Sequence, residues 1–393
     1  MVALYWIETM KACPMRVLNV NSSLDFRSGG GTAERTFQMS RFLARVNTKC
    51  TVFTIDTGLD QARVAALKPA EVVAIPLLWR RFYVPKINWN TIRKLVNDAD
   101  IIHLMGHWGV LNALVYVAAR SAGKPYVVCP AGALPIFGRS AVLKRLYNFL
   151  IGNAIIRNAS AWIAVTPIEF AQFEKYGVPA SSITVIPNGV AVEDFPAVDV
   201  TAFREAKALP DRPLILFMGR LNLIKGPDLL LEAFASIKDR INDFHLAFAG
   251  PDEGMQDGLL EFARQNGIAD RVHFLGFVSG HDKVAAYRSA TLLAVPSRQE
   301  AMSIVALEAG ICGRPVLVTD QCGFGEIKSI CSDLETTADA AGIAAGLESV
   351  ITEPGMLERL GLLFRDFVMQ RYTWESIVAE YLKLYKNILT VKK

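Results

Sequence analysis

Short apolar runs alternate with amphipathic stretches along almost the whole chain of 393 residues, and this alternation constrains the fold more than any other feature. Each run suits a buried strand, and each stretch between two runs suits a helix that returns to the same sheet. Repeated strand, helix, strand units predict parallel sheets with helices on both faces. The predicted strands are residues 17–20, 51–55, 101–104, 126–129, 162–165 and 184–186, followed by 214–219, 245–250, 272–275, 291–295 and 315–318.

The alternation restarts after a short polar segment, residues 190–196, that ends in Pro196. Because 393 residues exceed the size of one ordinary core, the sequence predicts an α/β protein with two doubly wound domains, residues 15–195 and 196–372. Ligands of such open sheets bind beyond the carboxyl ends of the strands, so we expect the two domains to face each other across a ligand cleft. We interpret residues 1–14 as an extension before the first strand.

Composition excludes several classes of protein. Hydrophobic residues make up 52% of the chain, yet no run reaches the roughly 18 uncharged apolar residues of a membrane helix. Residues 1–14 lack the pattern of a secretory signal. The six cysteines are scattered without C-x-x-C pairs, so the sequence predicts neither a zinc site nor a disulfide framework, and a reducing cytoplasm fits best.

The strongest chemical motif is the segment 297–309, where two carboxylates, Glu300 and Glu308, flank a turn of small residues that opens an apolar helix. The preceding apolar run ends at Pro296, so the local order is strand, loop, helix. Glu300 then lies near the helix N-terminus, where backbone N–H groups favour anions. The motif therefore predicts a site for a phosphorylated ligand.

A second motif follows the predicted strand 214–219. Gly219 allows a tight turn, and two cations five positions apart, Arg220 and Lys225, come directly after it. A guanidinium can grip phosphate oxygens with two parallel hydrogen bonds and an ammonium adds a point charge, so the pair suits a diphosphate. A loop with two solvated cations is the alternative.

The first half offers three candidate features. A glycine-rich loop, residues 26–35 with Gly29, Gly30 and Gly31, follows the first strand but lacks G-x-G-x-x-G spacing, so a flexible turn remains an alternative. His103 lies inside an apolar run and is expected to be a core histidine, whereas His107 lies beyond that strand, where a side chain can face a ligand. Asn188 belongs to an Asn-Gly turn at a strand end, which ordinary turn chemistry also explains.

These motifs, taken in order, resemble the retaining glycosyltransferases of the GT-B fold, specifically family 4. The second half matches at Gly219-Arg220, Lys225-Gly226, Ala249-Gly250-Pro251 and the segments 272–276, 300–308, 313–316 and 323–326; the first half matches at the glycine loop, His107 and residues 187–190. The C-terminal segment 371–375 resembles the start of that family's final helix, so residues 373–393 are expected to pack back on the first domain.

The resemblance implies that Arg220 and Lys225 bind the donor's diphosphate, that Glu300 contacts the transferred sugar and that Glu308 holds the nucleotide ribose. It implies a catalytic set of His107, Glu300, Arg220 and Lys225. The implied donor-binding set is Gly30, Gly31, Asn188, Gly219, Arg220, Lys225, Glu300, Ala301, Met302, Ser303, Ile304 and Glu308. We expect a nucleotide-diphosphate sugar as co-substrate, no cofactor and no metal, because the two cations can stabilise the leaving group and no strand-end loop carries D-x-D.

The acceptor is expected on the basic first half, where residues 1–200 carry 21 Lys+Arg and 13 Asp+Glu, a net charge of +8, whereas residues 201–393 carry 21 and 25, a net charge of −4. Segments 78–86 and 139–157 interleave cations with aromatic and aliphatic residues, as segments that lie on an anionic bilayer do. A solvated helical face is the alternative. We expect a glycan or lipid-linked acceptor of bacterial surface polysaccharide or lipopolysaccharide synthesis, a peripheral position at the inner face of the cytoplasmic membrane, and no nucleic acid.

Two other functions remain open. The first is a nucleotide-sugar 2-epimerase on the same architecture, which would need acid/base carboxylates in the first domain; Asp25 and Glu34 are the only candidates near the glycine loop. The second is a non-catalytic subunit that binds a nucleotide sugar and supports a partner transferase. The joint presence of Arg220, Lys225, Glu300, Glu308 and His107 argues against this last function.

Overall fold

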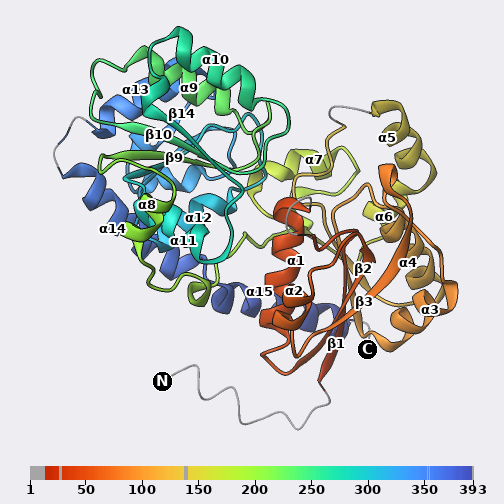
Figure 1. Cartoon of the computed structure of the whole chain (residues 1–393). Helices are drawn as coiled ribbons and strands as arrows, with labels where there is room; N and C mark the ends of the chain where they lie inside the picture. Colours follow the sequence, from red (N-terminus) through yellow and green to blue (C-terminus); the bar gives the residue numbers. More distant parts are fainter. Residues whose placement is uncertain (1–13, 26–28, 137–139, 352, 354, 392–393) are drawn as a thin grey trace. The chain divides into compact units, whose positions relative to one another are not determined.

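The computed structural model describes residues 14–25, 29–136, 140–351, 353 and 355–391. The predicted extension 1–14, except Pro14, therefore lies outside the described residues, as do residues 26–28 of the glycine loop and Arg139. By their contacts the residues form two compact units (Figure 1). The first runs to Ile163 and takes in Gln172–Thr184 and the segment from Glu380; the second contains Ala164–Ala171 and Val185–Ala379. The domain bounds predicted from the sequence stay a prediction.

The first unit is built on an eight-stranded sheet in the order β4-β3-β2-β1-β5-β6-β7-β8. The pairings of β1, β2, β3, β5, β6 and β7 are parallel, and β4 pairs antiparallel to β3 at the edge. The strands are β1 (Met15–Val20), β2 (Thr48–Asp56), β3 (Glu71–Trp79), β4 (Val84–Pro85), β5 (Ile101–Met105), β6 (Tyr126–Cys129), β7 (Ala161–Ala164) and β8 (Ile183–Val185).

Helices cover both faces of this sheet (Figure 1), which is why β5 and β6 are buried along their whole length. They are α1 (Gly30–Leu43), α2 (Gln61–Ala66), α3 (Trp89–Asp98), α4 (Val110–Ser121), α5 (Ala141–Tyr147) and α6 (Asn153–Arg157), with the later parts of α7 (Phe170–Glu174) and α15 (Trp374–Val391). Buried polar contacts hold α15 in this unit, since Arg35 donates to Tyr381 Oη at 2.6 Å and His103 Nδ1 lies 2.7 Å from Tyr385 Oη.

The second unit is built on a six-stranded parallel sheet in the order β11-β10-β9-β12-β13-β14. Its strands are β9 (Leu214–Met218), β10 (His245–Ala249), β11 (Val272–Gly276), β12 (Leu292–Val295), β13 (Val316–Thr319) and β14 (Glu335–Thr336). Its helices are α8 (Val200–Ala206), α9 (Pro227–Ser236), α10 (Gln256–Gln265), α11 (Gly280–Ser289), α12 (Ile304–Ile311), α13 (Ala340–Ile351), α14 (Met356–Arg371) and the start of α15.

Strand order reverses once in each sheet, between β1 and β5 and between β9 and β12. In doubly wound sheets the loops at such a reversal form the ligand site, because they diverge to opposite faces and leave a crevice at the carboxyl ends of the strands. The prediction of two doubly wound α/β units is thereby confirmed. The loops that follow β9 and β12 carry the predicted cations and Glu300, so the second unit's candidate site lies at its reversal.

Candidate functional site

The loop that follows β12, residues 296–303, is the centre of the site in the second unit, and neighbouring segments hold its backbone at several points. Thr319 Oγ1 donates to the Ser297 carbonyl at 2.5 Å, and the Arg298 N–H donates to the Ile224 carbonyl at 2.8 Å. The Glu300 N–H donates to the Gln321 carbonyl at 2.9 Å. We call this segment the 296–303 loop; its conformation is fixed by the loops after β9 and β13.

Two glycines allow these loops to approach so closely. A Cβ on Gly226 would lie 2.1 Å from the Pro296 carbonyl oxygen, and a Cβ on Gly323 would lie 1.9 Å from the Ala301 carbonyl oxygen. Both glycines have a positive φ, +68° and +63°, which side chains rarely adopt. The two glycines therefore let neighbouring backbone contact the 296–303 loop on both sides.

Two further side chains, Thr166 and Asn188, hold the end of the 296–303 loop. Thr166 Oγ1 donates to the Ala301 carbonyl at 3.2 Å, and Asn188 Nδ2 donates to the Met302 carbonyl at 2.9 Å. Asn188 is buried, and its side-chain amide stabilises the 296–303 loop through this hydrogen bond. Its predicted contact with the donor remains a prediction, and the structure assigns it a contact with Met302, another residue of the predicted donor-binding set.

The two predicted cations each face a carboxylate. Arg220 lies 2.8 Å from Glu253, which also accepts a hydrogen bond from Asn222 at 2.7 Å. The Lys225 ammonium contacts Glu300 in a pair whose side chains are only 24% and 12% exposed. Burial lowers the pKa of Lys225, and the Arg220 cation nearby lowers it further, whereas the contacting carboxylate favours the charged form. The loop after β9 thus brings both cations to the same site.

Polar atoms without a protein partner occur in the 296–303 loop. Glu300 Oε2 and Ser303 Oγ are buried, and neither has a hydrogen-bond partner among the described residues. Ser303 precedes the first residue of α12, Ile304, but its hydroxyl makes no capping hydrogen bond. Buried polar groups of native proteins nearly always have a partner, so these two atoms mark a place where a ligand can bind.

Glu308 lies on α12 and both of its oxygens accept a hydrogen bond. Lys283 Nζ lies 2.8 Å from Oε1, and the hydroxyl of Tyr287 donates to Oε2 at 2.6 Å. Glu308 is 7% exposed and Tyr287 is fully buried. Burial, with the neighbouring carboxylate, raises the pKa of Tyr287 well above its usual range, so its hydroxyl stays a donor.

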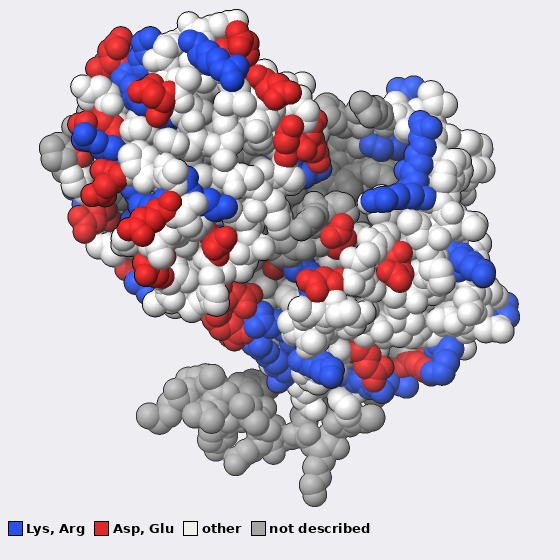
Figure 2. Space-filling model, viewed as in Figure 1, with Lys and Arg blue, Asp and Glu red and all other residues white. Residues whose placement is uncertain are grey.

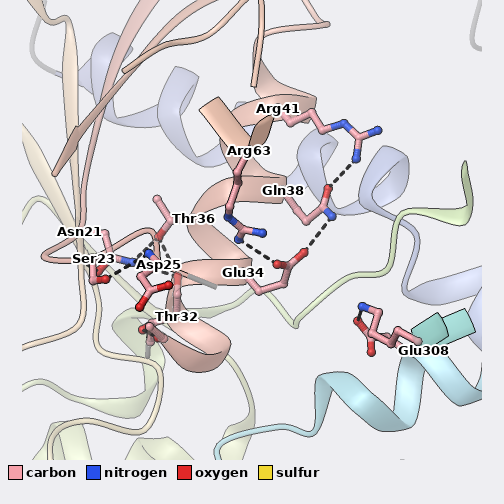
Figure 3. Close-up of polar contacts among 12 residues, drawn as sticks. Asn21, Ser23, Asp25, Thr32, Glu34, Thr36, Gln38, Arg41, Arg63 and Glu308 are labelled. Atoms are coloured by element: carbon pink, nitrogen blue, oxygen red, sulfur yellow. Dashed lines mark hydrogen bonds and ion pairs between the residues drawn. The ribbon is translucent and has the colours of Figure 1, made fainter. Parts of the chain in front are cut away.

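Gly30 and Gly31 open α1 in the first unit and are exposed. Figure 3 shows the polar side chains that α1 carries after them. Glu34 accepts from Arg63 at 2.9 Å and from Gln38 Nε2 at 2.9 Å, and Arg41 donates to Gln38 at 3.2 Å. Glu34, one of the two carboxylates considered for the alternative epimerase, is therefore held by a cation and an amide.

His107 lies after β5, at the first unit's strand reversal, in a buried aromatic surrounding. Its imidazole is 2% exposed and packs against the rings of Trp108, Tyr147 and Tyr176. Nε2 donates to Asn148 Oδ1 at 2.8 Å, because an amide oxygen can only accept. Burial lowers the pKa of His107 to about 4, so the ring is neutral at pH 7. Nδ1 is then an acceptor, and it has no partner among the described residues.

His103 is confirmed as a core histidine. It is fully buried in β5, and burial lowers its pKa to about 3. The described residues contain no group of three or more His, Cys, Asp or Glu side chains arranged to hold a metal ion.

The sequence did not indicate several residues that shape the site: Thr166, Glu253, Lys283, Tyr287 and Thr319. The first four contact a predicted site residue from another segment of the chain, and Thr319 contacts Ser297 of the motif 297–309. Only one local signal existed for Lys283 and Tyr287, which are four positions apart and so share one face of α11.

Two doubly wound units, with paired cations and carboxylates at the second unit's strand reversal, have the architecture of the GT-B fold. Residues 199–361 match the family profile of glycosyl transferases group 1, and residues 29–194 match that of glycosyltransferase family 4. The chain belongs to family 4 of the GT-B glycosyltransferases, as the sequence motifs predict.

A relative of this chain is a D-inositol 3-phosphate glycosyltransferase of Xylanimonas cellulosilytica, 31% identical over 399 residues that span 91% of each protein. Among solved structures, Anabaena HepE in complex with UDP and glucose is 19% identical with a TM-score of 0.75, covering 95% of this chain and 100% of HepE. WaaG, a glycosyltransferase involved in lipopolysaccharide biosynthesis, is 18% identical with a TM-score of 0.66, covering 94% of this chain and 99% of WaaG. At these identities the two structures support the fold alone.

Proposed function

We propose that the protein is a retaining, metal-independent glycosyltransferase that moves a hexosyl group from a nucleotide-diphosphate sugar to a glycan or lipid-linked acceptor of bacterial surface polysaccharide or lipopolysaccharide synthesis. One observation carries the proposal: Glu300 Oε2 and Ser303 Oγ are buried without a described partner, beside the Lys225 cation. Sugar hydroxyls can donate to both oxygens. The UDP and glucose bound to HepE and the lipopolysaccharide role of WaaG agree with this assignment.

Binding of the diphosphate is assigned to Arg220 and Lys225. Both cations already face carboxylates, so an arriving diphosphate competes with Glu253 for Arg220 and with Glu300 for Lys225. When the diphosphate takes the Lys225 ammonium, the Glu300 carboxylate becomes available to the sugar hydroxyls. Phosphate binding and sugar binding are thereby linked through one ion pair.

In the proposed reaction, the bond between the anomeric carbon and the diphosphate oxygen breaks, and both electrons leave with the diphosphate. Arg220 and Lys225 stabilise this developing charge, which is the role that a metal ion would otherwise have. The acceptor hydroxyl attacks from the face that the diphosphate leaves, so the anomeric configuration is retained. Its proton passes to a phosphate oxygen, which balances the charge of the step.

For the first unit, the proposal keeps the roles that the family resemblance implies. Gly30 and Gly31 are assigned to the donor, and His107 is assigned to the reacting sugar. The neutral imidazole supports this role, because its Nδ1 can accept a hydrogen bond from a sugar hydroxyl and has no partner among the described residues.

The test of donor binding compares R220A and K225A with R240A. Arg240 pairs with Glu348 on the surface of the second unit, so R240A removes a cation outside the proposed site and serves as the matched control. Loss of one stabilising donor costs about 100-fold to 1,000-fold in kcat, so each site variant should lose at least about 100-fold while R240A keeps the wild-type rate. Transfer within a few-fold of wild type in R220A and K225A would show that the leaving group is not held there.

The donor is identified by a panel of UDP-, GDP- and ADP-sugars, read as a rise in melting temperature, because a ligand stabilises in proportion to the logarithm of its saturation. Incubation of the best donor without acceptor separates the alternatives. An epimer of the donor would indicate the epimerase, and turnover with acceptor would exclude the non-catalytic subunit.

We also propose that the first unit touches an anionic membrane surface through the helical stretch that begins with α5. Large apolar side chains are exposed there, with Val142 at 74% and Phe149 at 82%. Lys144 and Arg145 lie between them in the sequence, and Figure 2 shows Lys and Arg side chains over the α5 region. Apolar side chains that enter the headgroup layer and cations that meet anionic lipids together give such binding. None of the described helices has the length and apolarity to cross a membrane.

Flotation with phosphatidylglycerol vesicles at low salt tests this surface, with phosphatidylcholine vesicles for comparison. The wild type and L362S, which changes an exposed leucine of α14 in the second unit, should float with anionic vesicles only. F149S should float several-fold less. Absence of binding by the wild type at low salt would contradict the proposal, as would equal binding by F149S.

A further inference from the structure

Glu308 is the one carboxylate of the predicted site whose two oxygens are both held by side chains of a single other helix. Lys283 and Tyr287 lie four positions apart on α11, so they project from the same face and meet Oε1 and Oε2 respectively. A carboxylate bound at both ends cannot rotate about its terminal bond. Its remaining lone pairs therefore point in fixed directions.

The two partners differ in surroundings. Tyr287 has no exposed surface, and the Lys283 side chain is 19% exposed. The Lys283 ammonium also lies 5.4 Å from the centre of the Phe195 ring, and Phe195 packs against Tyr287. Lysine, tyrosine and phenylalanine thus form one packed support under the carboxylate, all within the second unit.

Resting on the proposed function, in which Glu308 accepts hydrogen bonds from the ribose, we propose that Lys283 and Tyr287 are positioning residues that orient Glu308 for the two hydroxyls of a ribose diol. Tyr287 fixes the plane of the carboxylate through Oε2. Lys283 fixes Oε1 through its charge-assisted hydrogen bond at 2.8 Å. A site built in this way discriminates against a ribose that lacks a hydroxyl, because one oriented acceptor is then left without its donor.

The discriminating measurement is the ratio of two dissociation constants, obtained by calorimetry for the 2′-deoxy and the ribo form of one nucleoside diphosphate. UDP and GDP are tried first, and the tighter one is compared with its 2′-deoxy counterpart. A hydrogen bond to a charged group implies a ratio of about 10 or more for the wild type. In Y287F and in K283M the ratio should fall to about 3 or less, because the ribo form loses more affinity than the deoxy form, which presents only its 3′-hydroxyl to Glu308.

The matched controls remove a tyrosine hydroxyl and a lysine ammonium that do not contact Glu308. Tyr126 donates a buried hydroxyl to the Ile155 carbonyl in the first unit, and Lys238 donates to the Asn266 carbonyl in the second. Y126F and K238M should keep the wild-type ratio. Melting curves verify that each variant is folded, and K283M tests the idea by itself should Y287F not fold, because Lys283 is partly exposed.

The outcomes separate the two proposals. If the wild type binds a nucleoside diphosphate but both variants keep its ratio, or lose affinity for ribo and deoxy forms equally, the positioning role is overturned and the proposed function stands. A wild-type ratio near 1 also overturns the positioning role, since the ribose is then not read at Glu308. If the wild type binds no nucleoside diphosphate, the proposed function fails as well.

Discussion

The two buried histidines of the first unit predict an unusual loss of stability at mildly acidic pH. His103 and His107 are both essentially inaccessible to water, and burial lowers their pKa values to about 3 and about 4. An imidazole in an unfolded chain has a pKa of about 6.5. Between pH 6.5 and pH 4 the unfolded chain therefore binds protons that the folded unit excludes, and the free energy of unfolding falls as the pH falls.

The magnitude follows from these pKa values. At pH 8 the imidazoles are neutral in both the folded and the unfolded state, so their titration takes nothing from the free energy of unfolding. At pH 5 the unfolded imidazole is about 97% protonated and the folded one is not, which costs about 2 kcal/mol for each histidine. We therefore expect the first unit to lose about 4 kcal/mol between pH 8 and pH 5, a large share of the 5–15 kcal/mol of a typical domain.

The assay is urea unfolding at pH 8 and at pH 5, followed by a probe in the first unit. H103N and H107Q keep a polar atom near the bonded nitrogen and cannot take up a proton. Each variant's own difference between the two pH values should be smaller than that of the wild type by about 2 kcal/mol. H281Q, at an exposed position, should keep the wild-type difference. If H103N and H107Q also keep it, the folded histidines are protonated and the reasoning is wrong.

Two further predictions concern the 296–303 loop. G323A forces a side chain into a positive φ and toward the Ala301 carbonyl, so it should destabilise the second unit by about 3 kcal/mol in thermal unfolding. The control G258A, in α10 with open space around it, should stabilise the unit by up to about 1 kcal/mol. Equal effects of the two substitutions would contradict the close packing at Gly323. N188A removes the hydrogen bond to the Met302 carbonyl, so it should cost about 1–2 kcal/mol and raise the donor KM more than it lowers kcat; an unchanged KM would show that the loop does not depend on this amide.

The buried strands were predictable because each is a short apolar run between turns. The predicted runs at 101–104, 126–129 and 291–295 overlap β5, β6 and β12, whose residues are buried. Three strands, β3, β4 and β14, were not predicted. Only Ile75 of β3 is buried, so this strand shows no buried apolar run, and β4 and β14 have two residues each, too few for any period. Their pairing with β2, β3 and β13 is tertiary information.

The candidate site was predictable where a motif contained charged residues directly after a predicted strand. Arg220 and Lys225 follow β9, and Glu300 follows β12, so adjacency of these two strands is enough to bring the three residues together. His107 follows β5, as the sequence indicates, and its contact with a ligand stays a prediction. Its surroundings were not predictable, because Asn148 and Tyr176, which contact its ring, come from segments about 40 and 70 residues away. No spacing in the sequence relates those segments to the strand end.

In the 296–303 loop, three backbone carbonyls contact the rest of the protein, whereas two side-chain oxygens have no partner among the described residues. The Ser297, Ala301 and Met302 carbonyls already accept hydrogen bonds from three side chains outside the loop. The polar atoms that lack a described partner are instead the side-chain oxygens of Glu300 and Ser303. A loop whose carbonyls are already held by the protein needs little reordering when a ligand arrives, so little binding energy is lost to its entropy. Specificity at this loop should therefore change with residues 300 and 303, and affinity for every donor should change together when Thr166, Asn188 or Thr319 is lost.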